Sequence, residues 1–359
     1  MNRYVQWLRN NVFSGPVDCF ITLSLGLFLW WAMGPLLDWL VIDAVFSGTS
    51  NEQCNPDAAC WIFIREFLPQ FIFGFYPEDE RWRVSLAAAT AILLLLIFFL
   101  INRYFPKNHS IRIAFPWVVL IAYPTISITL LYGSFLGVNI FGLNIVETHQ
   151  WGGLFLTLII AVSGIVGAFP LGIALALGRQ SELPVIRAFC RIFIEVWRGV
   201  PLITVLFMAS VMLPLFLPNN IDINKLVRAL LCIMLFSSAY LAEVIRGGLQ
   251  SLPSGQQEAA SALGLSYWQQ MRYIILPQAL QQVIPGIVNT FIGLFKDTTL
   301  VLIIGLFDFL GIVQAAASNA QWLGHAIEGY IFAAMVFWCF CFLMSRYSLH
   351  LENKNRIQL

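Results

Sequence analysis

The chain has 359 residues, of which 59% are hydrophobic and only 11% are charged. Soluble domains carry roughly 25% charged residues, so this composition indicates a membrane protein. The number of long apolar runs excludes a two-domain soluble protein and predicts an all-α integral membrane protein. The formal net charge of +1 offers no basic surface for nucleic acid.

Eight apolar runs can be drawn as membrane spans, because crossing ~30 Å of hydrocarbon takes ~20 helical residues. Basic residues precede the first run, as in a signal peptide, but no small-residue cleavage site follows, which predicts an uncleaved span. The sixth run is short and has Lys225 and Arg246 at its ends, and Lys296-Asp297 interrupts the seventh. The runs cover residues 19–37, 84–101, 113–132, 151–177, 200–218, about 229–242, about 279–307 and 329–345.

The distribution of basic residues predicts the orientation in the membrane. With both termini cytosolic, fourteen basic residues lie inside and five lie outside, as the positive-inside rule requires. Segments 41–83 and 133–150 are then outside, and segments 102–112, 178–198 and 254–277 are inside. The inside set is Arg3, Arg9, Arg103, Lys107, Arg112, Arg179, Arg187, Arg191, Arg198, Arg246, Arg272, Arg346, Lys354 and Arg356, and the outside set is Arg65, Arg81, Arg83, Lys225 and Arg228.

The inside loop 254–277 carries helix signals of its own. Ser254 and Ser266 are each followed three residues later by glutamine, the spacing of a capping box. Gly264 lies between them, where a helix that ends in a left-handed residue favours glycine. The pattern predicts two short helices, with Pro277 ending the second or beginning the next span. An ordinary inter-helix loop is the alternative.

The residues of this loop resemble the EAA loop of ABC-transporter permeases. In that family the loop is a coupling helix that docks into a groove on a cytosolic ATPase, so the resemblance implies the same role here. The matching positions are Glu258-Ala259-Ala260, Gly264, Ile274 and Leu276-Pro277.

Further motifs narrow the resemblance to amino-acid transport. Over roughly 200 residues the downstream part resembles the polar amino-acid permeases (histidine, glutamate, glutamine, arginine and opine type), which implies a five-helix type I importer core. The upstream part resembles the N-terminal extension of the longer permease subunit of general L-amino-acid transporters. The downstream pieces are 195–201, 239–248, 255–256 and 296–300, and the upstream pieces are 59–61, 71–77 and 80–84.

Three regions follow from this comparison. Residues 1–149 form an N-terminal extension with about three spans and the outside loop 41–83. Residues 150–348 form the permease core, with the coupling loop at about 253–277. Residues 349–359 form a cytosolic tail.

Lys296 and Asp297 fall inside an apolar run, where an ionisable group costs about 3 kcal/mol on insertion scales and usually faces a cavity or a partner. A zwitterionic amino acid needs a cation near its carboxylate and an anion near its ammonium group. The alternative is a pair that tethers neighbouring helices, and either this subunit or a mate holds the site. The candidate substrate-pathway residues are Lys296, Asp297, Thr298, Thr299, Ser238 and Glu243.

Charged pairs at helical spacing flank the loop. Glu195 with Arg198, and Glu243 with Arg246, are each three residues apart, which predicts local ion pairs. The alternative for Arg198 and Gly199 is that their turn supports the coupling loop. The candidate ATPase-coupling residues are Glu258, Ala259, Ala260, Gly264, Leu276, Pro277, Arg198 and Gly199.

Cysteine, histidine and nucleotide-binding patterns add little chemistry. Cys54 and Cys60 share the outside loop, where an oxidising compartment permits a disulfide, with two free thiols as the alternative. The four histidines are scattered near span ends and predict no metal site. The sequence contains no G-x-x-x-x-G-K-[ST], so ATP and Mg²⁺ are expected in a partner ATPase and the chain itself is not an enzyme.

The sequence therefore predicts a multi-pass inner-membrane permease subunit of a binding-protein-dependent amino-acid ABC importer, with broad L-amino-acid specificity. Expected partners are a second permease subunit in a heterodimer, two ATP-binding subunits, a periplasmic amino-acid-binding protein and membrane lipid, but no nucleic acid. A subunit specific for acidic amino acids and an ion-coupled secondary transporter are the alternatives. A membrane-embedded enzyme would need a polar cluster that the sequence does not display.

Overall fold

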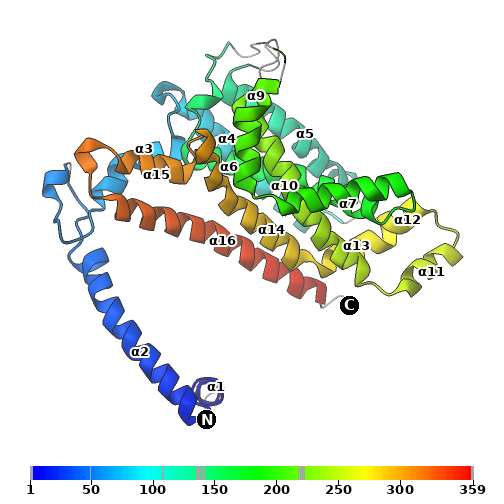
Figure 1. Ribbon diagram of the computed structural model, residues 1–359, viewed down its shortest axis with the longest axis horizontal. Helices are drawn as coiled ribbons and strands as arrows, with labels where there is room; N and C mark the ends of the chain where they lie inside the picture. Colours follow the sequence, from blue (N-terminus) through cyan, green and yellow to red (C-terminus); the bar gives the residue numbers. More distant parts are fainter. Residues whose placement is uncertain are drawn as a thin grey trace. The chain divides into compact units, whose positions relative to one another are not determined.

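The structure is a computed structural model that describes residues 3–48, 50–106, 109–134, 138, 142–216, 218 and 223–356. The described chain consists of helices joined by turns, with isolated β-bridges, so the predicted all-α class is confirmed (Figure 1). The α-helices are α1 (Arg3–Asn11), α2 (Pro16–Leu37), α3 (Ile62–Phe73), α4 (Arg81–Tyr104), α5 (Ser110–Tyr132), α6 (Gly153–Arg179), α7 (Pro184–Gly199), α8 (Leu202–Phe207), α9 (Leu213–Phe216), α10 (Lys225–Gln250), α11 (Ser254–Ala262), α12 (Tyr267–Gln270), α13 (Leu276–Gln282), α14 (Ile284–Asp297), α15 (Phe309–Ala317) and α16 (Ala326–Arg356).

Short 3₁₀ and π segments join several of these helices. The π segments are η1 (Asp38–Ile42), η5 (Met208–Met212) and η6 (Met271–Ile275), and the 3₁₀ segments are η2 (Asn51–Gln53), η3 (Glu78–Glu80), η4 (Thr148–Gln150), η7 (Thr298–Ile304) and η8 (Ala320–Trp322).

Seven of the described helical segments are long and apolar enough to cross a membrane, and a bent pair adds an eighth. This agrees with the predicted number of spans. The pair is Pro184–Gly199 with Leu202–Phe216, bent by 100°. The second limb covers the predicted fifth run, 200–218, and the first limb, α7, makes the predicted inside segment 178–198 helical rather than a simple loop. Pro201 disfavours the α region for Val200, whose extended backbone breaks the two limbs apart.

The seventh predicted run also divides. The spanning part is Ile284–Ile304, and α13 precedes it as a separate helix that ends at Gln282. The run then tightens into η7 and stops at Gly305, which has a left-handed φ of 73°. The Lys296-Asp297 pair therefore lies at the end of α14 rather than in the middle of a long helix.

The segment 41–83, predicted to be an outside loop, contains a helix. Its helix α3 covers Ile62–Phe73. Arg65, Glu66 and Pro69 interrupt the apolar pattern of this segment, so hydropathy alone did not select it as an element.

The described chain falls into two compact units, residues 1–68 with 316–332 and residues 69–315 with 333–359. In the first unit the ring of Phe63 packs against Trp322 and Asn51 donates a hydrogen bond to the Gln321 carbonyl. The predicted division near residue 150 rests on sequence resemblance and stays a prediction. The predicted tail 349–359 begins inside α16, and residues 357–359 lie outside the described residues.

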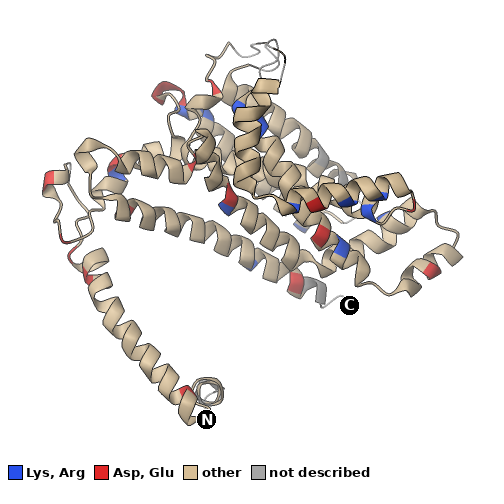
Figure 2. Ribbon diagram, in the orientation of Figure 1, with Lys and Arg blue, Asp and Glu red and all other residues tan. Residues whose placement is uncertain are grey.

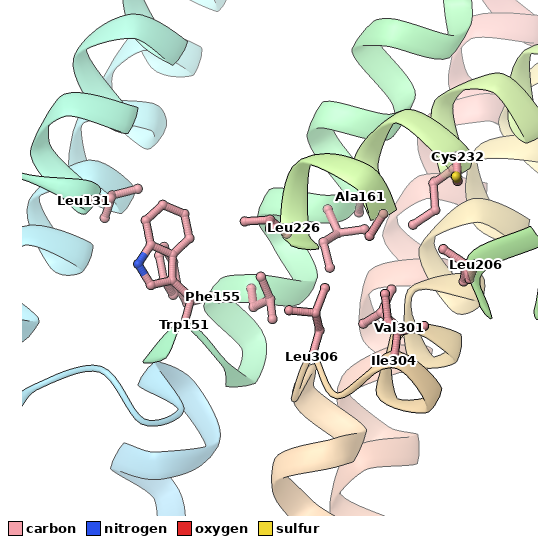
Figure 3. Packing of buried hydrophobic residues seen from close by; sticks show 14 of the residues in the cluster. Leu131, Trp151, Phe155, Ala161, Leu206, Leu226, Cys232, Val301, Ile304 and Leu306 are labelled. Atoms are coloured by element: carbon pink, nitrogen blue, oxygen red, sulfur yellow. The ribbon is translucent and has the colours of Figure 1, made fainter. Parts of the chain in front are cut away.

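The second unit has an apolar core built around α6 and α10. Phe155, Leu156, Ile160 and Ala161 of α6 are buried together with residues of α8, α10, α14 and η7 (Figure 3). Gly172 allows the backbones of α6 and α10 to approach, because a Cβ there would lie 2.7 Å from the Leu241 Cβ. Small residues are the usual means of such close packing between membrane helices.

Three chain segments cross near the start of α6, at the end of the second unit that is predicted to face outside. The Gly153 N–H donates to the Phe307 carbonyl at 3.0 Å, and Gly74 pairs with Trp151 in an isolated bridge. A Cβ on Gly152 would lie 2.9 Å from the Phe307 carbonyl oxygen. The crossing therefore joins part of the predicted N-terminal extension to the predicted core.

Candidate coupling loop and substrate pathway

The predicted coupling loop consists of α11, a tight turn and α12. Gly264 has a φ of 74°, so the predicted left-handed glycine is confirmed. Its N–H donates to the Ser261 carbonyl at 2.9 Å, and the Leu265 N–H donates to the Ala260 carbonyl at 3.3 Å. These two bonds form a Schellman motif, which satisfies carbonyl groups at the end of α11.

One of the two predicted capping boxes is present. The Gln269 Oε1 accepts a hydrogen bond from the Ser266 N–H at 2.9 Å, which confirms the box at the start of α12. The box predicted at Ser254 is wrong, because Pro253 is the N-cap of α11 and Ser254 is already its first helical residue. Pro277 lies in the first turn of α13, which follows the π turn Met271–Ile275 without a break, so it neither ends the second helical piece nor begins the span, which starts at Ile284.

The base of the loop packs against four other helices. Met271 and Ile275, from the π turn that follows α12, are buried with residues of α6, α7, α10 and α13. A Cβ on Gly248 would lie 2.6 Å from the Ala279 carbonyl oxygen, so α10 and α13 are in close contact. In Figure 1 the α11–α12 loop extends from this packed base, beside α13. The cluster comprises Ala176, Ile194, Ala242, Ile245, Leu249, Met271, Ile275 and Ala279.

The faces of α11 differ in burial. Ala260 is 1% exposed and points toward the protein, whereas Glu258 and Ala259 are exposed. Leu263, at the C-cap, is 78% exposed.

An ionic cluster centred on Glu243 lies beside the base of the loop. The Arg246 Nε and Nη2 donate to its Oε2 at 3.0 and 2.8 Å, and the Arg179 Nη1 bonds to its Oε1. The Arg198 Nη1 lies 3.8 Å from the same carboxylate and its guanidinium is 5.5 Å from the centre of the Tyr240 ring. The cluster joins α6, α7 and α10, and its charges are visible where these helices meet (Figure 2).

The predicted pair of Glu195 with Arg198 is wrong. In the described residues the ion-pair partner of Glu195 is Arg179, at 3.8 Å, and that of Arg198 is Glu243. Both partners come from neighbouring helices, because the bend after α7 brings its C-terminal end against α6 and α10. The pair of Glu243 with Arg246 is confirmed.

The candidate substrate-pathway residues have different surroundings. Ser238 and Thr298 are fully buried, and each hydroxyl donates to a carbonyl of its own helical segment. Lys296 is exposed, and Asp297 and Thr299 are half-buried. In the described part of the chain neither Lys296 nor Asp297 has an ion-pair partner within 4.0 Å, so the tethering alternative has no contact to support it here.

Two polar groups that the sequence analysis did not select have defined roles in the structure. Arg179 is the partner of both acidic residues in the ionic cluster, although its sequence position suggested only a basic span end. Asp308 is fully buried and caps α15, accepting hydrogen bonds from the Leu310 and Gly311 N–H groups. Burial raises the pKa of Asp308 to about 6, against the lowering effect of these bonds. An aspartate three residues before a glycine in an apolar segment was the available signal.

Cys54 and Cys60 are joined in a disulfide, with their Cα atoms 5.5 Å apart. The His325 ring and both sulfur atoms lie within 4.8 Å of one another. The His325 Nδ1 is 3.1 Å from the Glu328 Oε1, which also accepts from the Cys60 N–H. Metals bind thiolates, so a disulfide leaves this group without its sulfur ligands.

Comparison with known proteins agrees with this architecture. Residues 168–357 match the sequence model of the family described as binding-protein-dependent transport system inner membrane component. The chain is 51% identical to the inner membrane amino-acid ABC transporter permease protein YhdY of Escherichia coli (strain K12), over 98% of this chain and 93% of that protein. It is 39% identical to the glutamate/glutamine/aspartate/asparagine transport system permease protein BztC of Rhodobacter capsulatus, with the same coverage.

A solved structure supports the fold of the downstream part. A chain from the crystal structure of an amino acid ABC transporter with histidines aligns with a TM-score of 0.50 and 30% identity, covering 56% of this chain and 92% of that chain. The family match, the near full-length relatives and the spans agree. The chain therefore belongs to the binding-protein-dependent inner-membrane transport components and, among them, to the amino-acid ABC transporter permeases.

Proposed function

We propose that the chain is the transmembrane subunit of an ATP-driven amino-acid importer in which α11 docks on a partner ATPase. The two ends of the loop differ in burial, and this difference supports the proposal. Its base is buried against α6, α7 and α10, whereas Glu258, Ala259 and Leu263 are exposed outside the spans. A rigid base with an exposed tip can transmit a push from the ATPase to several spans at once.

The proposed assembly contains a second permease subunit as heterodimer mate, two ATP-binding subunits and a periplasmic binding protein that delivers the amino acid. ATP and Mg²⁺ bind to the ATP-binding subunits. Both termini of this chain face the cytosol, which is supported by fourteen basic residues inside against five outside. Binding protein and nucleotide then bias two arrangements of the spans.

For the substrate we propose broad L-amino-acid specificity, with Lys296 and Asp297 at the pathway. Lys296 is the single cation of α14 and Asp297 its single anion, which fits the carboxylate and ammonium groups shared by all amino acids. Aspartate and glutamate carry a second carboxylate, and leaving it unpaired at depth is costly. The mate subunit completes the site.

A narrower specificity for acidic amino acids is the second candidate. The name of BztC couples glutamate and aspartate with their amides, and GltK of Escherichia coli, 35% identical over 52% of this chain, is named a glutamate/aspartate import permease protein. These names favour acidic substrates, whereas the single cation of α14 favours a permissive pathway.

Replacement of Gly264 tests the coupling role. A Cβ at Gly264 meets nothing within 4 Å, so Gly264→Val strains the left-handed backbone without causing a clash. We expect the variant to insert normally but to lose ATP hydrolysis stimulated by the loaded binding protein in reconstituted membranes. Gly264→Asn is the matched control, because asparagine tolerates this conformation, and it should keep most of the stimulation. Wild-type stimulation in Gly264→Val would show that the turn does not couple.

Competition for uptake tests the substrate. The complete complex, purified with its associated chains identified, imports labelled glutamate into vesicles. We expect excess leucine, histidine and arginine to compete. Competition by aspartate and glutamate alone would replace broad specificity by the acidic candidate, without affecting the docking role of α11.

A further inference from the structure

A buried glutamine, Gln270, lies on the side of the coupling loop that faces the protein. Gln270 is the last residue of α12, and it is 7% exposed although it lies on a polar loop. Its Nε2 donates to the Leu265 carbonyl at 2.7 Å and to the Ser261 Oγ at 3.2 Å. One amide group therefore bonds both to the turn and to the last part of α11.

Without this amide, no bond among the described residues of the turn would hold α11 and α12 at a defined angle. Gly264 has the backbone freedom of glycine, and no side chain would contact a Cβ placed on it. The Schellman bonds stabilise the end of α11, and the capping box stabilises the start of α12. Each acts at its own helix end, so neither determines the angle between the two helices as the Gln270 amide does.

Gln270 is also attached to the packed base. It is followed directly by the π turn Met271–Ile275, in which Met271 and Ile275 are buried against the ends of α6, α7 and α10. A displacement of α11 can therefore pass through the Gln270 amide into the helices that carry the spans. A turn that flexed at Gly264 would absorb the displacement.

We propose that Gln270 is a positioning residue that makes α11, the turn and α12 move as one body during transport. This inference rests on the proposed docking of α11 to the ATPase. Gln270 does not contact the ATPase in this proposal, since its side chain is turned toward the protein.

The test uses the complete complex in reconstituted membranes and compares Gln270→Met with wild type. Methionine retains the length, the burial and the helix propensity of glutamine but removes both hydrogen bonds. We expect the maximal rate of stimulated ATP hydrolysis to fall by roughly fivefold for each of the two hydrogen bonds that methionine cannot form. The concentration of loaded binding protein that gives half-maximal stimulation should not change, because the outside docking face is untouched. A purely structural defect would lower assembly and would not separate these two quantities.

Gln278→Met is the matched control. Gln278 is a half-buried glutamine whose amide donates to the Ile274 carbonyl within the same helical run, so its loss leaves the loop braced. It should retain the wild-type rate.

Ser261→Ala removes one of the two hydrogen-bond acceptors of the Gln270 amide. It serves as the test variant if Gln270→Met does not assemble. It should lower the stimulated rate by a smaller factor, and the double variant should be no worse than Gln270→Met.

A cysteine at Leu263 distinguishes failure of this proposal from failure of the docking role. Leu263→Cys should form a cross-link to the ATPase subunit in complexes that are otherwise wild type, and also in Gln270→Met. Without a cross-link in the first case, α11 does not dock and the proposed function fails. A cross-link in both, together with an unchanged stimulated rate in Gln270→Met, overturns the role of Gln270 alone.

Discussion

Among single residues, the Glu243 carboxylate is the shared ion-pair partner of three arginines. Its side chain is 15% exposed and three guanidinium groups surround it. Glu195 makes a single contact of 3.8 Å and its side chain is 60% exposed. Water screens such an exposed pair, whereas a shielded carboxylate with short hydrogen bonds contributes more. The two acidic residues should therefore differ in their contribution to stability, although both pair with Arg179.

We predict that Glu243→Gln destabilises the protein by about 1–3 kcal/mol, because three arginines then lose their shared anion. Glu195→Gln is the control and should cost less than about 0.5 kcal/mol. The thermal unfolding midpoints of the purified proteins in detergent measure the difference. Equal midpoints for the two variants would refute a central role for Glu243.

Asp308 predicts a pH dependence of stability. Its pKa rises from 3.8 to about 6 on folding, so between these values the folded protein binds more protons than the unfolded chain. Stability should then fall as pH rises through this window and change no further above it. Asp308→Asn retains an acceptor for the Gly311 N–H and removes the titration.

The measurement is the difference in thermal midpoint between Asp308→Asn and wild type, from about pH 4 to about pH 7. The difference should shift in favour of the variant as pH rises. Other titrating groups are common to both proteins and cancel. A difference that does not vary with pH would contradict a protonated, buried Asp308.

Among the secondary-structure elements, apolar runs predict where the helices lie, whereas proline and glycine residues determine where several of them end. Pro201 separates α7, in the predicted inside segment 178–198, from the limb Leu202–Phe216 in the predicted fifth span, and the two are bent by 100°. Gly305 ends η7 in a left-handed conformation and returns the chain to the start of α6. The crossing of residues 71–76, 151–153 and 307–308 depends on backbone contacts that side chains would prevent.

We predict that Gly153→Ala strongly destabilises the protein. Gly153 has a φ of 67°, which costs alanine about 1–2 kcal/mol, and its Cβ would overlap the Phe71 carbonyl oxygen. Gly247→Ala is the control, since a Cβ there meets nothing within 4 Å and alanine favours the interior of α10. The yield of folded protein and its thermal midpoint measure both. Wild-type behaviour of Gly153→Ala would show that the crossing is not tightly packed.

At the scale of the whole molecule, the arrangement of spans predicts the side on which each segment lies. The clearest pair of test positions lies on either side of α4, at Glu52 before it and at Ser110 after it. Both side chains are exposed. Asn108, which belongs to the same predicted inside segment as Ser110, is not among the described residues.

We predict that single cysteines at Glu52 and Ser110, in a chain without its native cysteines, react with an impermeant reagent from opposite sides. Glu52→Cys should react from outside and Ser110→Cys from the cytosol, because one span, α4, separates them. Labelling efficiency in intact cells and in inverted vesicles measures this. Labelling from the same side would require the first three spans to be redrawn.

Features whose signals are local can be predicted from the amino-acid sequence. Apolar runs predict spans because a helix must satisfy its own backbone in lipid, and glycine at 264 predicts a left-handed turn because other residues resist it. The capping box at Ser266 follows from a spacing of three residues. The family resemblance depends on such local motifs, which is why the chain could be assigned to the permeases before its fold was known.

Contacts between groups that are far apart in the sequence depend on the packing of the helices. The spacing of Glu195 and Arg198 suggested a local pair, yet Arg179 bonds to Glu243, 64 residues away, and the Thr157 hydroxyl accepts from the Phe309 N–H, 152 residues away. The sequence places Gln270 in a polar loop, but it does not predict that the Gln270 amide bonds to Ser261 and Leu265. Such partners depend on the angles at which helices pack and on the bends between them. Those angles arise from contacts across the whole unit, so no short stretch of sequence specifies them.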